Sequence, residues 1–211
     1  MTSIIAGLFD IVVGSVMLLL FVRFMLQFAE VETKQPFARV IYRITHVVDV
    51  FGRIFPTWLD GKINTAALAL MALLRLIYIW GVLQMLNLDS QYIGWFQMND
   101  FNLKMVEHLH RYFSPFMLVF VTLMTLVLDF LRMCRYLIIA SFLVSWVVFF
   151  SNKMPPAFTM IEQLSQPIIA PFRKLLPATG MLDFAPMIGF FAITLLELVV
   201  QTMAVYLLTL T

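Results

Sequence analysis

Four stretches of the chain consist predominantly of apolar residues. They run from Ile4 to Phe28, from Ile63 to Leu86, from Phe116 to Phe150 and from Phe184 to Leu210. A helix needs roughly 20 apolar residues to cross a hydrocarbon core about 30 Å thick. The pattern therefore predicts about four transmembrane helices.

The third stretch is too long for a simple span. Its roughly 35 residues would form a helix about 52 Å long, and it carries Asp129, Arg132 and Arg135. We expect the span proper to be its second half, from Arg132 to Phe150, extended at its start by a helix that leaves the core. The alternative is a separate short span from Phe116 to Leu131.

Two segments between the spans have the pattern of amphipathic helices. Residues 36–55 place apolar side chains in steps of three and four, with Arg39, Arg43 and Arg53 on the opposite face. A basic amphipathic helix with too many charges to span is typical of a helix lying in the membrane interface. Residues 158–175 repeat the pattern, and there we expect Pro167 and Pro171 to kink or break the helix.

These segments belong to an internal repeat. FGRIFP at residues 51–56 corresponds to FRKLLP at 172–177, and GKINTA at 61–66 corresponds to GMLDFA at 180–185. Each copy consists of a span, an in-plane amphipathic helix, a Pro–Gly turn and a second span. We predict an all-α membrane protein of two parallel repeats. Residues 1–86 form the first, 87–115 a linker and 116–211 the second.

Composition excludes most other classes of protein. Of the 211 residues, 62% are hydrophobic and 12% are charged, whereas a soluble domain has about 25% charged residues. A soluble enzyme and a nucleic-acid-binding module are therefore excluded. A single cysteine, Cys134, excludes an intrachain disulfide and a cysteine metal cluster. The first apolar run is longer than that of a signal peptide and no basic residue precedes it, so we expect a retained helix.

The distribution of Lys and Arg predicts the orientation. The loop with the first in-plane helix carries five basic residues and its counterpart carries three, whereas the linker has only Lys104 and Arg111. Because basic loops stay in the cytoplasm, we expect both repeat loops there and both termini outside. The expected partners are the bilayer, its anionic headgroups, and other membrane proteins or further copies of the chain. No nucleic-acid partner is expected, because the net charge is only +2.

Residues 166–186 read QPIIAPFRKLLPATGMLDFAP, a Pro-rich dibasic stretch followed by a Pro–Gly turn and an acidic helix start. This pattern resembles the YggT/YlmG family of small bacterial and plastid membrane proteins. The matching residues are Pro167, Pro171, Arg173, Lys174, Pro177, Gly180, Asp183 and Pro186. Ala185 departs from the usual Ser, and Lys174 from the commoner Arg. In the first copy Val50, Gly52, Asn64 and Ala67 replace Pro171, Arg173, Asp183 and Pro186, so the second copy is the better candidate for a site.

The resemblance covers nearly the whole chain and implies an integral protein of the bacterial inner membrane with no established enzymatic activity. Members of the family have loose links to osmotic or potassium stress and to cell division or nucleoid organisation. In plastids, members are linked to cytochrome haem attachment. These links do not map to particular residues of this sequence.

The motif residues have a structural and a functional interpretation. A carboxylate at Asp183 suits the start of the fourth span, because it caps free N–H groups and complements the helix dipole. Alternatively, Asp183 contacts Arg173 or Lys174 and closes the loop into a binding surface. Arg173 and Lys174 themselves either anchor the loop to anionic lipid or dock a partner.

Two charged residues lie near the middle of apolar spans, Arg75 in the second and Glu197 in the fourth. A lone charge at mid-bilayer costs at least about 2.5–3.5 kcal/mol, so such residues usually pair. We predict that Arg75 and Glu197 form an intramembrane pair, either as a structural lock or as part of an ion path. Asp10 and Arg132 are a weaker candidate for a similar pair.

No cofactor or metal is predicted. His108 and His110 are two residues apart, which points their rings away from each other on a helix, and haem ligation by His46 is a remote alternative. We therefore interpret the chain as a non-enzymatic scaffold or assembly factor with in-plane helices and a basic Pro-rich motif on the cytoplasmic face. The first alternative is transport of an ion, potassium among the candidates, or a role in osmotic stress. The second is an accessory role in cytochrome haem maturation.

Overall fold

The computed structural model describes residues 2–33, 35–55, 57–58, 61–88, 96, 98–151, 156–174 and 183–209. Eight helices lie within these residues. They are α1 (Thr2–Phe28), α2 (Pro36–Ile44), α3 (Val47–Phe51), α4 (Thr65–Leu88), α5 (Asp100–Arg111), α6 (Pro115–Ser151), α7 (Pro156–Arg173) and α8 (Ala185–Thr209). Trp58 and Ile63 form one isolated antiparallel bridge before α4.

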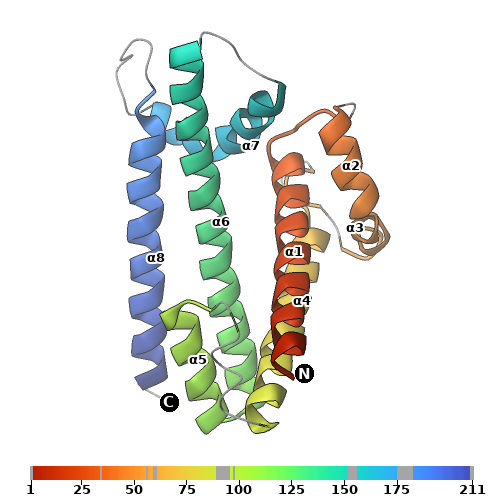
Figure 1. Cartoon of the computed structure of the whole chain (residues 1–211), viewed down its shortest axis with the longest axis vertical. Coiled ribbons are helices and arrows are strands. Elements are labelled where there is room, and N and C mark those ends of the chain that lie inside the picture. Colours follow the sequence, from red (N-terminus) through yellow and green to blue (C-terminus); the bar gives the residue numbers. More distant parts are fainter. Residues whose placement is uncertain are drawn as a thin grey trace.

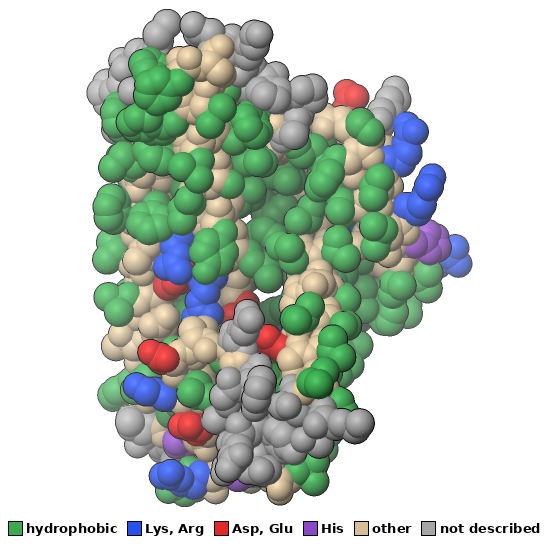
Figure 2. Space-filling model, in the orientation of Figure 1, with side chains coloured by type: hydrophobic (Ala, Val, Ile, Leu, Met, Phe, Trp, Pro, Cys, Tyr) green, Lys and Arg blue, Asp and Glu red, His purple; other side chains and the backbone are tan. Residues whose placement is uncertain are grey.

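Four of the described helices, α1, α4, α6 and α8, are long and apolar enough to cross a membrane. They run along the long axis of the molecule, with both chain ends at the same end of the bundle (Figure 1). Helix α1 packs on α4, α8 packs on α6, and α4 packs on α6. Hydrophobic side chains cover most of the visible outer face (Figure 2), as lipid-exposed helices require. The predicted all-α multi-pass architecture is confirmed.

Helix α6 decides between the two alternatives for the third stretch. It is a single helix of 37 residues from Pro115 to Ser151, so the segment before Arg132 extends the same helix, and Met117, Val121 and Leu128 in it are buried inside the bundle. The alternative of a separate short span from Phe116 to Leu131 is wrong. The charges at Asp129 and Arg132 do not end the helix, because both side chains find partners inside the bundle.

The first amphipathic segment forms two short helices rather than one. Helix α2 ends at Ile44 and α3 begins at Val47, and between them the Thr45 hydroxyl donates a hydrogen bond to the Ile41 carbonyl oxygen at 2.6 Å. Ile41 and Val48 are buried, and α2 packs on α1. Many of the other apolar residues are exposed, among them Phe37, Val40, Ile44, Val47, Val50 and Ile54.

The second amphipathic segment forms α7, which continues through Pro167 and Pro171. Of the two predicted effects of these prolines, a kink or a break, the break does not occur. Proline removes the hydrogen bond to the carbonyl four residues earlier, but Met160, Leu164 and Ile169 are buried and α7 packs against α6 and α8. This packing stabilises the helix despite the missing bonds. Helix α7 lies across the bundle near the end of α6 (Figure 1).

The linker contains a helix that places polar groups near the bundle centre. Asn99 caps α5, because its side-chain oxygen accepts a hydrogen bond from the Asn102 backbone N–H at 2.9 Å. Met105, Val106 and Leu109 are buried on its inner face, and α5 packs against α6 and α4. The start of α5 therefore approaches the middle of the two long helices.

Candidate functional site

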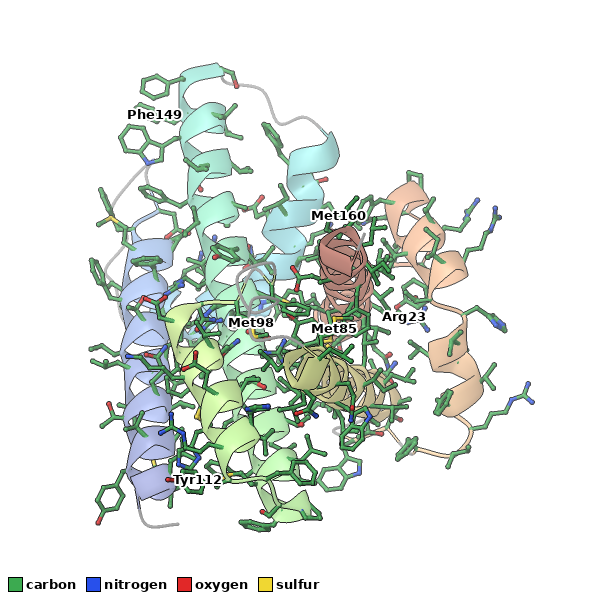
Figure 3. The ribbon with its side chains drawn as sticks, turned by 60° about the horizontal axis from the view of Figure 1, so that its bottom comes forward. Arg23, Met85, Met98, Tyr112, Phe149 and Met160 are labelled. Atoms are coloured by element: carbon green, nitrogen blue, oxygen red, sulfur yellow. The ribbon has the colours of Figure 1, made fainter. Side chains whose placement is uncertain are left out.

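A polar cavity of about 250 Å³ lies where α1, α4, α6 and the start of α5 meet. Met98, which lies just before α5 and lines the cavity, points toward the centre of the bundle (Figure 3). The polar residues that line the cavity are Asp10, Arg75, Tyr78, Asn99, Asn102, Asp129 and Arg132. A polar cavity among membrane-spanning helices is a candidate functional site, because charged groups at that depth are expensive to bury.

The central contact of the cavity is an ion pair between α4 and α6. Arg75 Nη1 lies 2.9 Å from Asp129 Oδ2, and only 9% and 18% of the two side chains are exposed. Arg75 Nε also donates to Thr125 Oγ1 at 3.0 Å. Arg132 Nη1 donates to Asp129 Oδ1 at 3.0 Å, which the three-residue separation on α6 allows. Asp129 therefore contacts two guanidinium groups.

Helices α5 and α1 complete the network. Asn102 Nδ2 donates to Asp129 Oδ1 at 3.2 Å, and the Tyr78 hydroxyl donates to Asp10 Oδ1 at 2.6 Å. The Tyr78 ring also lies 5.0 Å from the Arg75 guanidinium carbon. These contacts join all four helices around one group of charges.

Two atoms of the network lack a hydrogen-bond partner among the described residues. They are Arg75 Nη2 and Asn102 Oδ1, in residues that are 8% and 3% exposed. A buried polar atom without a partner costs about 1–3 kcal/mol. Neighbouring protein atoms cover both, so this cost belongs to the packing of the network and does not mark a ligand position.

The predicted pair of Arg75 and Glu197 does not form. Glu197 Oε2 instead accepts from Arg135 Nη1 at 2.9 Å, which joins α8 to α6. Helix α6 packs on both α4 and α8 and supplies each of the two residues with its partner. The pair was predicted from similar depth along the two spans, and depth does not determine which helices are neighbours.

Asp10 and Arg132 line the same cavity. Arg132 donates a hydrogen bond to Asp129, and the Tyr78 hydroxyl donates one to Asp10. Asp129, Tyr78 and Asn102 were not predicted as parts of one site. The sequence did contain an indication of a role for Asp129, because an acidic residue within an apolar run is expensive to bury without a partner.

The motif of the second repeat brings Arg173 and Asp183 together. Arg173 Nε donates to Asp183 Oδ2 at 2.6 Å, and Arg173 Nη1 donates to Gln166 Oε1 at 2.7 Å. Asp183 Oδ1 meanwhile accepts from the backbone N–H of Ala185 at 2.9 Å. The carboxylate therefore caps the start of α8 and also contacts Arg173 at the end of α7. Residues 175–182, the loop that this contact was expected to close into a binding surface, lie outside the described residues.

The other motif residues surround this contact. Pro167 and Pro171 lie within α7, Lys174 is exposed at its end, and Pro186 is buried in the first turn of α8, where no backbone N–H is needed. Pro177 and Gly180 lie outside the described residues.

The first repeat uses Asn64 where the second uses Asp183. Asn64 Oδ1 accepts from the backbone N–H of Ala67 at 3.0 Å, and Asn64 Nδ2 donates to Gln27 Oε1 at 2.7 Å. Gln27 Nε2 in turn donates to the carbonyl oxygen of Gly61 at 2.6 Å. Both repeats therefore cap the second span from the same position, but the first repeat ties that cap to α1.

A further buried charge, Arg23, joins α1 to α2 and α3. Arg23 is 3% exposed, forms an ion pair with Asp49 and stacks over the Tyr42 ring, 3.6 Å from its centroid. Figure 3 shows Arg23 between α1 and the α2–α3 pair. Burial raises the pKa of the Tyr42 hydroxyl, so the ring stays neutral beneath the cation. The sequence signal for this contact was a basic residue within the first apolar run.

The residues considered for metal or haem are scattered. Across the described ranges, no group of three or more His, Cys, Asp or Glu is placed to hold a metal ion. His46 is exposed before α3, His110 Nε2 lies 3.0 Å from Asn87 Oδ1, and Cys134 is buried.

Comparisons with known proteins identify related chains. A model of the CCB3/YggT family matches residues 2–86 and 117–204. The uncharacterized protein PA0392 of Pseudomonas aeruginosa is 27% identical over 185 residues, which are 87% of this chain and 81% of that protein. An uncharacterized protein of Haemophilus influenzae is 37% identical over 62 residues, which are 29% of this chain and 33% of that protein. No solved structure matches the chain significantly.

Proposed function

The chain belongs to the CCB3/YggT family, and on that premise we propose that it is a non-enzymatic scaffold that helps other membrane proteins assemble. The observation that carries this proposal is the separation of its charges between interior and surface. Inside the bundle, Asp129 pairs with Arg75 and Arg132, and Glu197 pairs with Arg135. These interior pairs hold the helices to one another. We therefore expect the charges on the surface to make the contacts with partner proteins.

Surface cations gather on α2 and α3. We define the basic edge as Arg39, Arg43, His46 and Arg53, which are all exposed. Blue and purple side chains project along this side of the molecule (Figure 2), next to the exposed apolar residues Phe37, Val40 and Ile44. A helix with both features lies at a membrane surface, where each basic residue gains about 1 kcal/mol from anionic lipid.

We therefore assign the basic edge to anionic headgroups and to the acidic surface of a partner membrane protein. The same edge is placed on the cytoplasmic side of a bacterial inner membrane, because basic residues are retained on that side. The Arg173–Asp183 contact joins the end of α7 to the start of α8 near the upper end of the bundle in Figure 1, the end toward which α2 begins.

The test compares two sets of substitutions in the full chain. Arg39, Arg43 and Arg53 are replaced by Gln, and in the control Lys104 and Arg111, exposed on α5, are replaced by Gln. We expect only the basic-edge variant to lose bound phosphatidylglycerol in native mass spectrometry and high-mass complexes in native gels of mild-detergent extracts. Unchanged lipid and complexes in the basic-edge variant would contradict the proposal, as would equal losses in the control.

A second function, transport of an ion or small charged solute, is favoured by the polar cavity. Its lining includes Asp10, Arg75 and Asp129 of the candidate spans α1, α4 and α6, and charged residues within spans commonly mark a solute path. Potassium flux into proteoliposomes, measured against protein-free vesicles, tests this function. Flux equal to that of the empty vesicles would exclude potassium transport and leave the scaffold role standing.

A further inference from the structure

An apolar groove of about 270 Å³ lies between α1, α4 and the α2–α3 pair. Among the residues that the structure describes along its walls, only Thr45 is not apolar. The Thr45 hydroxyl already donates to the Ile41 carbonyl oxygen, so its hydrogen is not available to a ligand. We call this space the α1–α4 groove, and its lining suits a hydrocarbon chain rather than a polar molecule.

The α1–α4 groove opens sideways, out of the bundle. Ile44 and Val47 on one wall, and Leu73 and Ile77 on the other, are all exposed large apolar residues. Helices α1 and α4 are candidate spans, so the surroundings of this opening are lipid. A chain from the bilayer can therefore enter the groove without any movement of the helices.

The α1–α4 groove has the depth of one leaflet. Its lining on α4 runs from Leu70 to Ile77, a rise of about 10 Å. This is the half of α4 that begins at Thr65, and the lining on α1 falls in the half that ends at Phe28. One leaflet of a hydrocarbon core is about 15 Å deep, so the groove follows most of the length of one acyl chain.

A cation lies at the rim of the α1–α4 groove. Arg43 directly precedes Ile44 of the lining, is exposed, and takes part in none of the ion pairs among the described residues. Asp49, the nearby carboxylate on α3, is paired with Arg23. An apolar groove with an uncompensated cation beside it is complementary to an amphiphile that has an apolar chain and an anionic head.

A second apolar groove, between α6 and α8, lacks this feature. Ile139 and Phe190 are among its lining residues, and all of the described ones are apolar. The basic residues of α6, Arg132 and Arg135, are paired with carboxylates, and the sequence of α8 contains no Lys or Arg. The helices that line the second groove therefore offer a place for a chain but no free cation for a headgroup.

We propose that the α1–α4 groove binds one anionic diacyl phospholipid, with an acyl chain between α1 and α4 and the phosphate beside Arg43. The inference rests on the assignment of the basic edge to anionic headgroups and adds a fixed position for the chain. Attraction to Arg43 selects the charge of the headgroup, whereas burial of the chain in the groove slows its departure. The lipid is therefore retained during purification in mild detergent.

The groove offers a matched pair of substitutions. Leu73 lines it on α4 and is 49% exposed, so Leu73→Trp places a larger side chain in the opening without replacing a core residue. Leu18 on α1 is 52% exposed and does not line the groove, so Leu18→Trp adds the same bulk elsewhere on the apolar surface. Arg43→Gln removes the charge of the rim and leaves the groove open.

The experiment adds phosphatidylglycerol and phosphatidylcholine with identical acyl chains to the purified full chain and measures bound lipid by native mass spectrometry. We expect the wild type and Leu18→Trp to retain one phosphatidylglycerol in preference to phosphatidylcholine. Leu73→Trp should bind it about tenfold more weakly. Arg43→Gln should bind both lipids equally, because only the charge preference is lost. Glycerophosphoglycerol, the headgroup without its chains, should not displace the bound lipid.

A second measurement needs no substitution and serves if Leu73→Trp does not fold. Phosphatidylglycerol with a photoreactive group on one acyl chain is crosslinked to the wild-type chain, and the labelled residues are mapped by peptide sequencing. We expect labels within residues 70–77 of α4 and 16–20 of α1, prevented by an excess of unlabelled phosphatidylglycerol. Labels spread evenly over the four spans would show that lipid occupies no fixed position, which overturns the proposal.

The contrary outcomes separate this inference from the proposed function. If Leu73→Trp retains phosphatidylglycerol as the wild type does while the basic-edge variant loses it, headgroups alone hold the lipid and the groove is not its site. Equal losses in Leu73→Trp and Leu18→Trp would likewise reject a specific groove. Loss of dimeric chains from the Leu73→Trp spectrum, with lipid unchanged, would show that a second copy covers the groove. Only unchanged lipid in the basic-edge variant contradicts the proposed function itself.

Discussion

Asp129 Oδ2 lies 2.9 Å from Arg75 Nη1, although Arg75 comes from the last helix of the first repeat and Asp129 from the first helix of the second. The pair therefore joins the two repeats inside the membrane-spanning bundle. Removing one partner leaves the other as an uncompensated buried charge, whereas removing both does not.

This contact leads to a prediction for a double-mutant cycle. Arg75→Gln and Asp129→Asn should each lower stability in detergent, by about 3–5 kcal/mol, because each leaves a buried charge without its partner. The double variant should lose less than the sum of the two, giving a measurable coupling energy. Recovery will be partial, because Arg132 also contacts Asp129. Thermal unfolding of the purified variants measures these values.

The cycle has an internal control in Arg75→Gln combined with Glu197→Gln. These two residues have different partners, Asp129 and Arg135, so their losses should add. Coupling between Arg75 and Glu197, without coupling between Arg75 and Asp129, would contradict the arrangement of α4, α6 and α8.

The two contacts of Asp183 can be separated by substitution. Asp183→Asn keeps a side-chain oxygen for the Ala185 N–H but removes the charge that faces Arg173. We expect it to cost at most about 1 kcal/mol, because the pair is partly exposed. Asp183→Ala also removes the cap and should cost about 1 kcal/mol more. Chemical unfolding in mixed micelles gives the difference, and equal losses from the two variants would show that the cap contributes nothing.

Gly81 lies where α4 passes close to the Phe9 ring of α1. A Cβ atom at Gly81 would lie 2.8 Å from Cζ of Phe9, and the Phe9 ring stacks on Tyr78 with centroids 5.7 Å apart. We expect Gly81→Val to lower stability by about 1–3 kcal/mol, the usual cost of overpacking. Gly7→Val is the control, because open space surrounds an added Cβ there. Equal melting temperatures for the two variants would contradict the close approach of α1 and α4.

The proposed orientation is tested by cysteine labelling in intact cells. In a Cys134→Ser background, we expect a cysteine at Arg53 to be protected from a membrane-impermeant reagent and one at Arg111 to be labelled. Both positions are exposed in the structure, so a difference in labelling reports the side of the membrane. The reverse pattern would invert the orientation, and equal labelling would reject an odd number of spans between the two sites, where α4 is the one candidate span among the described residues.

The sequence alone determined the spans and the local capping. Uninterrupted apolar runs can be satisfied in lipid only as helices, so the four long helices follow from composition along the chain. The cap at Asp183 was also predictable. A capping carboxylate and the free N–H groups of a helix start lie within a few residues of each other in the chain, so no tertiary information is needed.

Only the tertiary structure decided which buried charges meet. The position of Arg75 along α4 could be read from the sequence, but its partner depends on which helix faces that side of α4. The facing helix is α6, whose continuity through Asp129 and Arg132 reflects packing against α4, α5 and α8. Asn102 reaches the same cavity because the linker folds back as α5. These contacts join residues far apart in the chain, and an apolar pattern, which specifies depth and secondary structure, does not specify neighbours.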